Sequence, residues 1–145
     1  AQGFDWPVER TGDNELNLTI VGSWCDYSVN VTWMAGFETV QLTCAIDVKI
    51  APEKFPPVRS LLALLNERLW LGHFSLWTDE RELVFRVVLP LQGVDGISTE
   101  QCETMLQVAV DSCEQYYPAF QFVLWAGKTA EQAIAASMFE TAGTA

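Results

Sequence analysis

One twelve-residue stretch, Tyr116–Gly127, carries more apolar surface than an exposed segment of an acidic protein can leave in water. It holds five aromatic residues, one uncharged polar side chain and no charge. A sheet, a helix or a second molecule must therefore cover it. Pro118 disfavours helical geometry at the residue before it and removes one backbone donor. We therefore expect a helix that enters this stretch to stop or kink at Pro118, which makes the stretch a joint between two helices.

Alternating apolar residues predict an antiparallel sheet in the first third of the chain. A half-buried strand covers residues 16–20, and two longer strands follow, with apolar residues at odd positions over 25–33 and at even positions over 40–48. The two longer strands share an apolar face only if paired residue numbers sum to an odd value, which a two-residue loop at 35–36 or 36–37 supplies. Either register staggers Cys25 and Cys44 on the core face, so a disulfide between them is disfavoured.

Proline, turn and capping signals predict the remaining elements. These are an edge strand over Trp6–Arg10, a helix opened by Pro56-Pro57 and ended by Gly72, a hairpin of Phe74–Thr78 and Glu82–Leu91, and helices that begin at the capping boxes Ser98–Gln101 and Thr129–Gln132. The three helices carry apolar stripes at helical spacing: Val58, Leu61, Leu62, Leu65 and Leu69; Cys102, Met105, Leu106, Ala109 and Cys113; Ala133, Ile134 and Met138. The order β-β-β-β-α-β-β-α-α predicts an α+β fold, an antiparallel sheet packed by helices, as one domain over residues 1–145.

The charge balance narrows the class of partner. Nineteen acidic and eight basic residues give a formal net charge of −11, and the basic residues, from Arg10 to Lys128, are scattered singly. Nucleic acids and anionic membranes both require clusters of cations, so we expect neither as a partner. Two interpretations of the acidity remain open: a feature that keeps the protein soluble, or a surface that attracts a basic or amphipathic peptide. No run of eighteen apolar residues and no signal peptide is present, and we expect a cytoplasmic protein.

Reactive side chains are few and dispersed. The cysteines at positions 25, 44, 102 and 113 form no C-x-x-C pair, and the last two lie roughly 16 Å apart along a helix, so we expect four free thiols. His73 is the single histidine; a structural role and a partner for a cysteine-dependent activity are both considered for it. Neither a zinc spacing nor a phosphate-binding loop is present. We therefore predict no catalytic, cofactor or metal residue and no enzymatic activity.

The tryptophans are the remaining candidates for function. Trp24, Trp33, Trp70, Trp77 and Trp125 either form a pocket for a small molecule or belong to the core and a dimer interface. The candidate interface or partner-binding residues are Trp70, Trp77, Tyr117, Phe120, Phe122 and Trp125. A protein partner or a second copy of the chain is the expected ligand, and a small-molecule sensor is the alternative.

Two segments resemble one family. Residues Leu65–Phe74, with the sequence LNERLWLGHF, and Tyr116–Gln121, followed by Trp125, Gly127, Lys128 and the Thr129 cap, are similar to the YbjN family of bacterial sensory transduction regulators, and Trp24 also fits its pattern. The resemblance covers about residues 4–143. It implies a fold similar to type III secretion chaperones, a small acidic homodimer, and no catalytic or cofactor residues. It also implies a helix before the first strand, which we expect this chain to lack.

Overall fold

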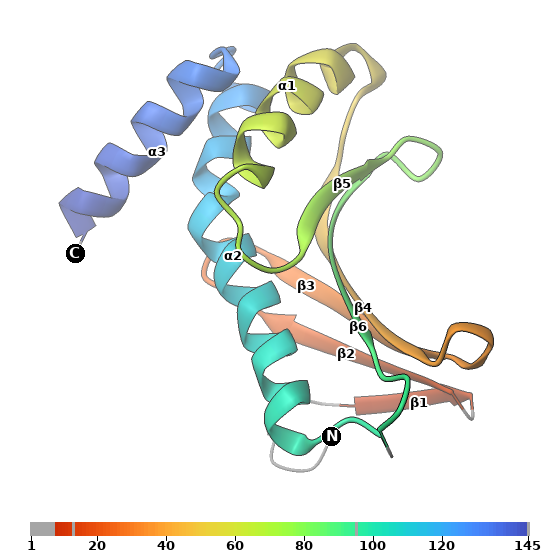
Figure 1. Ribbon diagram of the computed structural model, residues 1–145. Helices are drawn as coiled ribbons and strands as arrows, with labels where there is room; N and C mark the ends of the chain where they lie inside the picture. Colours follow the sequence, from red (N-terminus) through yellow and green to blue (C-terminus); the bar gives the residue numbers. More distant parts are fainter. Residues whose placement is uncertain (1–7, 13, 95, 145) are drawn as a thin grey trace.

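The computed structural model describes residues 8–12, 14–94 and 96–144, and the side chains of residues 14–94 and 96–138. Its elements are β1 (Val8–Gly12), β2 (Glu15–Val21), β3 (Asp26–Met34), β4 (Thr39–Lys49), α1 (Phe55–Asn66), β5 (His73–Trp77), β6 (Glu82–Pro90), α2 (Thr99–Trp125) and α3 (Ala130–Thr144), with the short 3-10 turns η1 (Ala35–Phe37) and η2 (Pro52–Lys54). This order and the α+β class confirm the prediction (Figure 1).

The strands form one antiparallel sheet in the order β1-β2-β3-β4-β6-β5. β1 is an edge strand as predicted, although Trp6 and Pro7 lie outside the described residues. In β3 and β4, Met34 pairs with Thr39, so paired numbers sum to 73, which is one of the two predicted registers. The predicted two-residue loop is wrong, because four residues, Ala35 to Glu38, connect the strands through the turn η1. Cys44 lies opposite Val29, well away from Cys25, because the register staggers the two cysteines.

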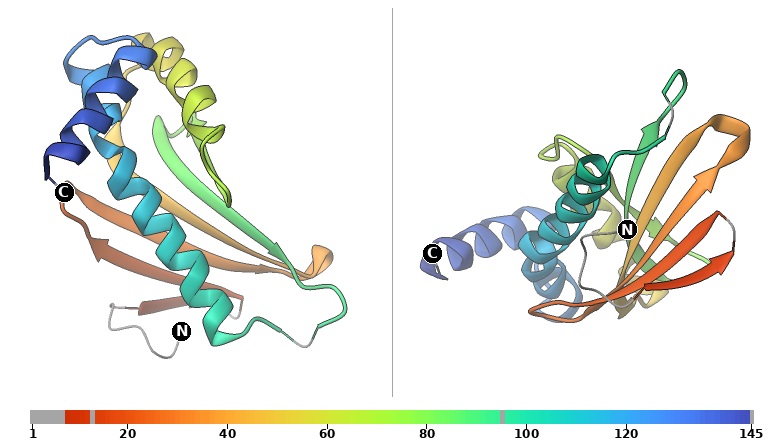
Figure 2. Two further views of the ribbon diagram at one scale, coloured as in Figure 1. Left: turned by 60° about the vertical axis from the view of Figure 1, so that its left-hand side comes forward. Right: turned by 90° about the horizontal axis from the view of Figure 1, so that it is seen from below.

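All three helices lie on one face of the sheet (Figure 2). α2 packs on β4 and β6, α1 packs on β5 and α2, and α3 packs on α2 and α1. Three rings centre the core: Phe74 of β5 lies edge-on to Phe85 of β6, with ring centroids 5.0 Å apart, and to Phe120 of α2 at 5.4 Å. The Tyr116–Gly127 stretch is therefore covered largely by its own chain, because α1, α3 and the sheet surround the second half of α2.

Both predicted capping boxes are present. The Gln101 amide N–H donates to Ser98 Oγ at 3.0 Å, and the Ser98 N–H donates to Gln101 Oε1 at 2.9 Å. Thr129 and Gln132 repeat the reciprocal arrangement in front of α3, at 3.2 and 3.0 Å. Each box satisfies two of the N–H groups that the first turn of a helix leaves without partners.

Two predicted helix ends are wrong. α2 does not stop at Pro118 but continues to Trp125, where Gly127, at φ 67°, and a hydrogen bond from Lys128 N to Phe122 O close it. Residues 117–120 are all buried, and this packing compensates for the backbone hydrogen bond that proline removes. α1 ends at Asn66, six residues before Gly72, so Leu69 lies beyond the helix.

No helix of the described residues covers the other face of the sheet, which is largely polar although it also carries Val84 and Val88. Asn30 Nδ2 of β3 donates hydrogen bonds to Glu15 and Asn17 of the neighbouring strand β2. Arg86 Nε of β6 donates to Gln41 Oε1 of β4 at 2.6 Å. These cross-strand bonds satisfy the polar side chains of the solvent face. In the described part of the chain, no helix combines the length and the hydrophobicity that crossing a bilayer requires.

Candidate functional site

The connection between α1 and β5 is a rigid joint built around one amide side chain. Asn66 Nδ2 donates to the carbonyl of Phe74 at 3.1 Å, and the Phe74 N–H donates to Asn66 Oδ1 at 2.8 Å. Because β6 pairs with β5 on the opposite side, Asn66 occupies the place of a neighbouring strand at the edge of the sheet. The last residue of α1 thus fixes where β5 begins.

Gly72 completes the joint. Its φ is +78°, and a Cβ atom at this position would lie 2.6 Å from Cζ of Phe85. Only glycine combines this backbone conformation with such a close approach to a core ring. Gly72 therefore shapes the entry to β5, not the end of α1.

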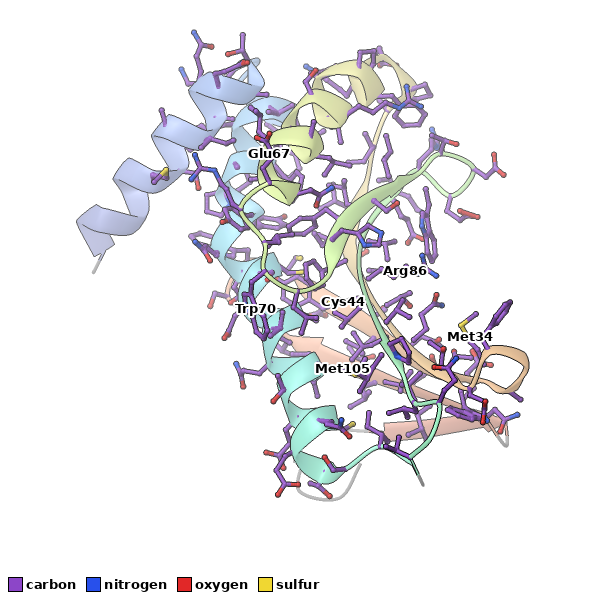
Figure 3. All side chains as sticks on the ribbon, viewed as in Figure 1. Met34, Cys44, Glu67, Trp70, Arg86 and Met105 are labelled. Atoms are coloured by element: carbon purple, nitrogen blue, oxygen red, sulfur yellow. The ribbon has the colours of Figure 1, made fainter. Side chains whose placement is uncertain are left out.

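Trp70 projects outward from this joint. Its neighbours Leu69 and Leu71 pack against the core, whereas the indole of Trp70 is 78% exposed. Figure 3 shows Trp70 over the middle of α2. Arg68 Nη1 lies 3.7 Å from Met138 Sδ of α3, and Met138 is itself exposed. Nothing in the fold requires an indole at position 70, since its burial contributes little to the core.

The turn between β2 and β3 is fixed to the other side of α2. Glu114 of α2 accepts hydrogen bonds from Ser23 N at 2.9 Å and from the Tyr27 hydroxyl at 2.5 Å. Trp24 stacks on Tyr117, with ring centroids 6.2 Å apart and planes 8° from parallel, and stays half-exposed. The turn thereby presents a second indole beside α2.

The carboxylate of Glu114 is held in its charged form. Its burial alone would raise its pKa, but the hydrogen bonds from Tyr27 and Ser23 outweigh that effect, so the pKa is lower than that of a free glutamate. The pKa of Tyr27 is raised, first by burial and then by its hydrogen bond to Glu114. Tyr27 therefore stays a neutral donor to an ionised acceptor.

The solvent face of the first half of α2 extends toward the N-terminus of the helix from the level of Tyr117, on which Trp24 stacks. Its residues Glu100, Glu103, Gln107 and Asp111 follow at helical spacing and are exposed, on the side opposite the buried Met105, Leu106 and Ala109. No lysine, arginine or histidine occurs in Thr99–Trp125 or in Ala130–Thr144. The face is acidic along its length.

The predicted interface residues divide into two groups. Trp70 and Trp125 are strongly exposed, at 78% and 62%, Trp77 is 38% exposed, and Phe122 is half-buried. Tyr117 and Phe120 belong to the core, at 5% and 2% exposure. Trp24 and Met138 are also exposed. Met138 was assigned to an inward stripe because local periodicity does not show where α3 extends beyond the rest of the fold.

The tryptophans do not share one pocket. Trp24 precedes β3 and Trp33 lies near its far end, which separates them by about 30 Å along an extended chain. Trp77 lies at the end of β5, pairing with Glu82 of β6, and Trp125 ends α2. Trp24 stacks on Tyr117 of α2, and Figure 3 shows Trp70 over the middle of the same helix.

The cysteines and the histidine lie on opposite faces of the sheet. Cys44 and Cys113 meet in the core with Sγ atoms 3.8 Å apart, and all four cysteines are free. The contact with Cys44 and burial raise the pKa of Cys113 well above its usual range. His73 is exposed and pairs with Arg86 on the solvent face. Among the described residues, no three metal-ligating side chains gather into a site.

Comparisons with known proteins bear on the family and the fold. No curated protein matches the sequence. A crystal structure of YbjN, "a putative transcription regulator from E. coli", is similar with a TM-score of 0.54 and 13% sequence identity, over 75% of this chain and 76% of that chain. At this identity the likeness concerns the fold alone.

The model of the YbjN family, described as "Putative bacterial sensory transduction regulator", matches residues 1–122. The match includes the Asn66–Phe74 joint and Trp24 and ends inside α2. The sequence resemblance at Trp125–Thr129 lies beyond it. Since the match covers most of the chain, this protein belongs to the YbjN family.

Proposed function

We propose that this protein is a non-enzymatic, cytoplasmic regulatory module that acts by binding another protein, and that it does so as a homodimer with a chaperone-like mode of holding its client. The description of the family supports a regulatory role. The exposed apolar residues that support protein binding are Trp70, on the α1–β5 loop, and Met138, on α3, which Arg68 of the same loop contacts.

The exposure of Trp70 carries the proposal. Large aromatic side chains are expensive to leave in water, and tryptophan is among the residues that dominate the binding energy of protein interfaces. Here the indole is 78% exposed on a segment fixed by Asn66 and Gly72, so it is presented without the entropic cost of ordering a flexible loop.

The test is to identify partners by co-purification from the native host and to reconstitute each one with purified protein. Trp70→Ala is expected to weaken binding at least tenfold, equivalent to about 1.4 kcal/mol, whereas its melting temperature stays close to that of the wild type. Phe37→Ala is the matched control, since Phe37 is 65% exposed in η1 at the opposite end of the sheet.

Two results would overturn the proposal: unchanged affinity of Trp70→Ala for every reconstituted partner, or equal losses in Trp70→Ala and Phe37→Ala. The first would remove Trp70 from the interface. The second would show that exposed aromatic surface acts without any preference for position.

A further inference from the structure

We propose that the partner presents a basic amphipathic segment. Its basic side chains would lie along the solvent face of the first half of α2, and its apolar side chains would contact Trp70 and Trp24 beyond the Asp111 end of that face. The inference rests on the proposed function and adds the chemistry of the partner. Its three parts are the placement of the two indoles, the charge of that face, and the partners that this charge excludes.

The two indoles lie on opposite sides of one helix. The α1–β5 loop and the β2–β3 turn flank α2 in both Figure 1 and the left view of Figure 2. On one side, Phe74 at the end of the loop is edge-on to Tyr116 at 6.2 Å. On the other side, Trp24 stacks on Tyr117. Tyr116 and Tyr117 border the buried side of α2, where Ala109, Cys113 and Phe120 lie, so the loop and the turn lie on opposite flanks of the helix. The exposed side of α2 runs between these flanks, and its nearest acidic residue, Asp111, lies about 9 Å from Tyr117 along the helix axis.

The solvent face of the first half of α2 carries negative charge that no residue of the same helix neutralises. Glu100, Glu103 and Asp111 are exposed, and Asp111 also accepts a hydrogen bond from Gln107 Nε2 at 2.8 Å. No basic residue occurs anywhere between Arg86 and Lys128. Arg68, the cation of the adjoining loop, has its guanidinium against Met138. Lysine or arginine side chains of a partner would find unpaired carboxylates here.

This charge excludes the other occupants of such a surface. A nucleic acid or an anionic membrane would be repelled. If a second copy of the chain bound with the same face, its carboxylates would lie opposite the carboxylates of the first copy, and like charges at a contact are unfavourable. A cationic segment with an apolar side satisfies both the indoles and the acids, so complementarity selects it.

The experiment uses two synthetic amphipathic peptides of eighteen residues, one of leucine and lysine and its twin of leucine and glutamate. Binding to the full chain is followed by calorimetry at low and high salt. The lysine peptide is expected to bind, more weakly as salt rises, and the glutamate peptide is not. Glu103→Gln with Asp111→Asn is expected to weaken binding by about tenfold, and Trp70→Ala by a similar factor.

Glu53→Gln with Glu80→Gln is the matched control, because it removes two exposed negative charges elsewhere and shifts the formal net charge equally, from −11 to −9. Unchanged binding in this control supports the site. Equal loss in both double variants would overturn it, since the attraction would then depend on net charge alone, and so would failure of the lysine peptide to bind.

The two proposals fail differently. If a native partner loses affinity for Trp70→Ala but not for Glu103→Gln with Asp111→Asn, Trp70 remains an interface residue and the inferred chemistry of the partner is wrong. If neither variant affects a native partner, the proposed function itself fails.

Discussion

Single side chains link elements that lie far apart in the sequence. Glu114 holds the β2–β3 turn against α2 through Ser23 and Tyr27, about ninety residues away along the chain. Gly22 makes this approach possible, because a Cβ atom there would lie 2.4 Å from the Tyr27 ring and 2.9 Å from Glu114 Oε2. The position of Trp24 therefore depends on a carboxylate that the sequence does not mark as special.

We expect Glu114→Gln to lower the free energy of unfolding by about 1 kcal/mol at pH 7, since hydrogen bonds to a charged acceptor are stronger than those to an amide. The folded pKa of Glu114 is depressed, so its contribution is complete above the ordinary glutamate pKa of about 4.3 and is lost as the pH falls through the folded value. The difference between wild type and variant should therefore shrink below about pH 4. Urea unfolding of both proteins at several pH values measures this difference in stability.

Glu103→Gln, on the exposed face of the same helix, is the control for this prediction and should change stability by no more than about 0.5 kcal/mol. If the stability difference between the wild type and Glu114→Gln stays constant from pH 7 to pH 3, the negative charge of Glu114 does not strengthen these hydrogen bonds.

At the scale of elements, the joint between α1 and β5 explains part of the family signature in structural terms. Asn66 pairs with both backbone groups of Phe74, and Gly72 lets the chain pass beside Phe85. Leu69 and Leu71 anchor the loop in the core. Trp70 is the large apolar residue of this segment that the joint does not explain, and for this reason it is the best candidate for function.

Asn66→Ala is expected to cost about 2 kcal/mol, because Phe74 would lose the partners of its N–H and carbonyl at a half-buried edge. Hydrogen exchange should show the Phe74 amide opening faster in the variant than in the wild type. Ser60→Ala, on the exposed side of α1, should leave both readouts nearly unchanged. An unaltered Phe74 exchange rate in Asn66→Ala would contradict the role given to the amide.

At the scale of the molecule, Trp70 and Trp125, the two most exposed indoles of the described residues, lie on separate surfaces. Trp70 lies beside the acidic middle of α2, and Trp125 ends the helix at 62% exposure. Self-association through the acidic face is disfavoured by repulsion between like charges, so we place the proposed dimer contact at Trp125.

Light scattering on the purified protein should therefore show a dimer at concentrations of about 10 µM and above. Trp125→Ala should shift the population toward monomer, whereas Trp70→Ala should leave it unchanged. A strict monomer for the wild type would contradict the dimer, and equal effects of the two substitutions would contradict its placement.

The sequence by itself determined the order of the elements, both capping boxes and the parity of the β3–β4 register. These depend on spacing within a few residues, such as the three-residue step from Ser98 to Gln101, or on the two-residue period of a strand. It also determined that the molecule is acidic and that α2 and α3 contain no cation.

Only the tertiary structure decided which of the apolar and acidic residues lie on the surface. Pro118 removes a backbone hydrogen bond and so predicts a break in the helix. Residues 117–120 are nevertheless buried by elements from distant parts of the chain, and this packing keeps α2 continuous. The same packing buries Phe120 and leaves Trp70 exposed, although the sequence treats both as aromatic residues in apolar segments. The exposure of a side chain depends on contacts between residues far apart in the sequence, so the local sequence pattern cannot predict it.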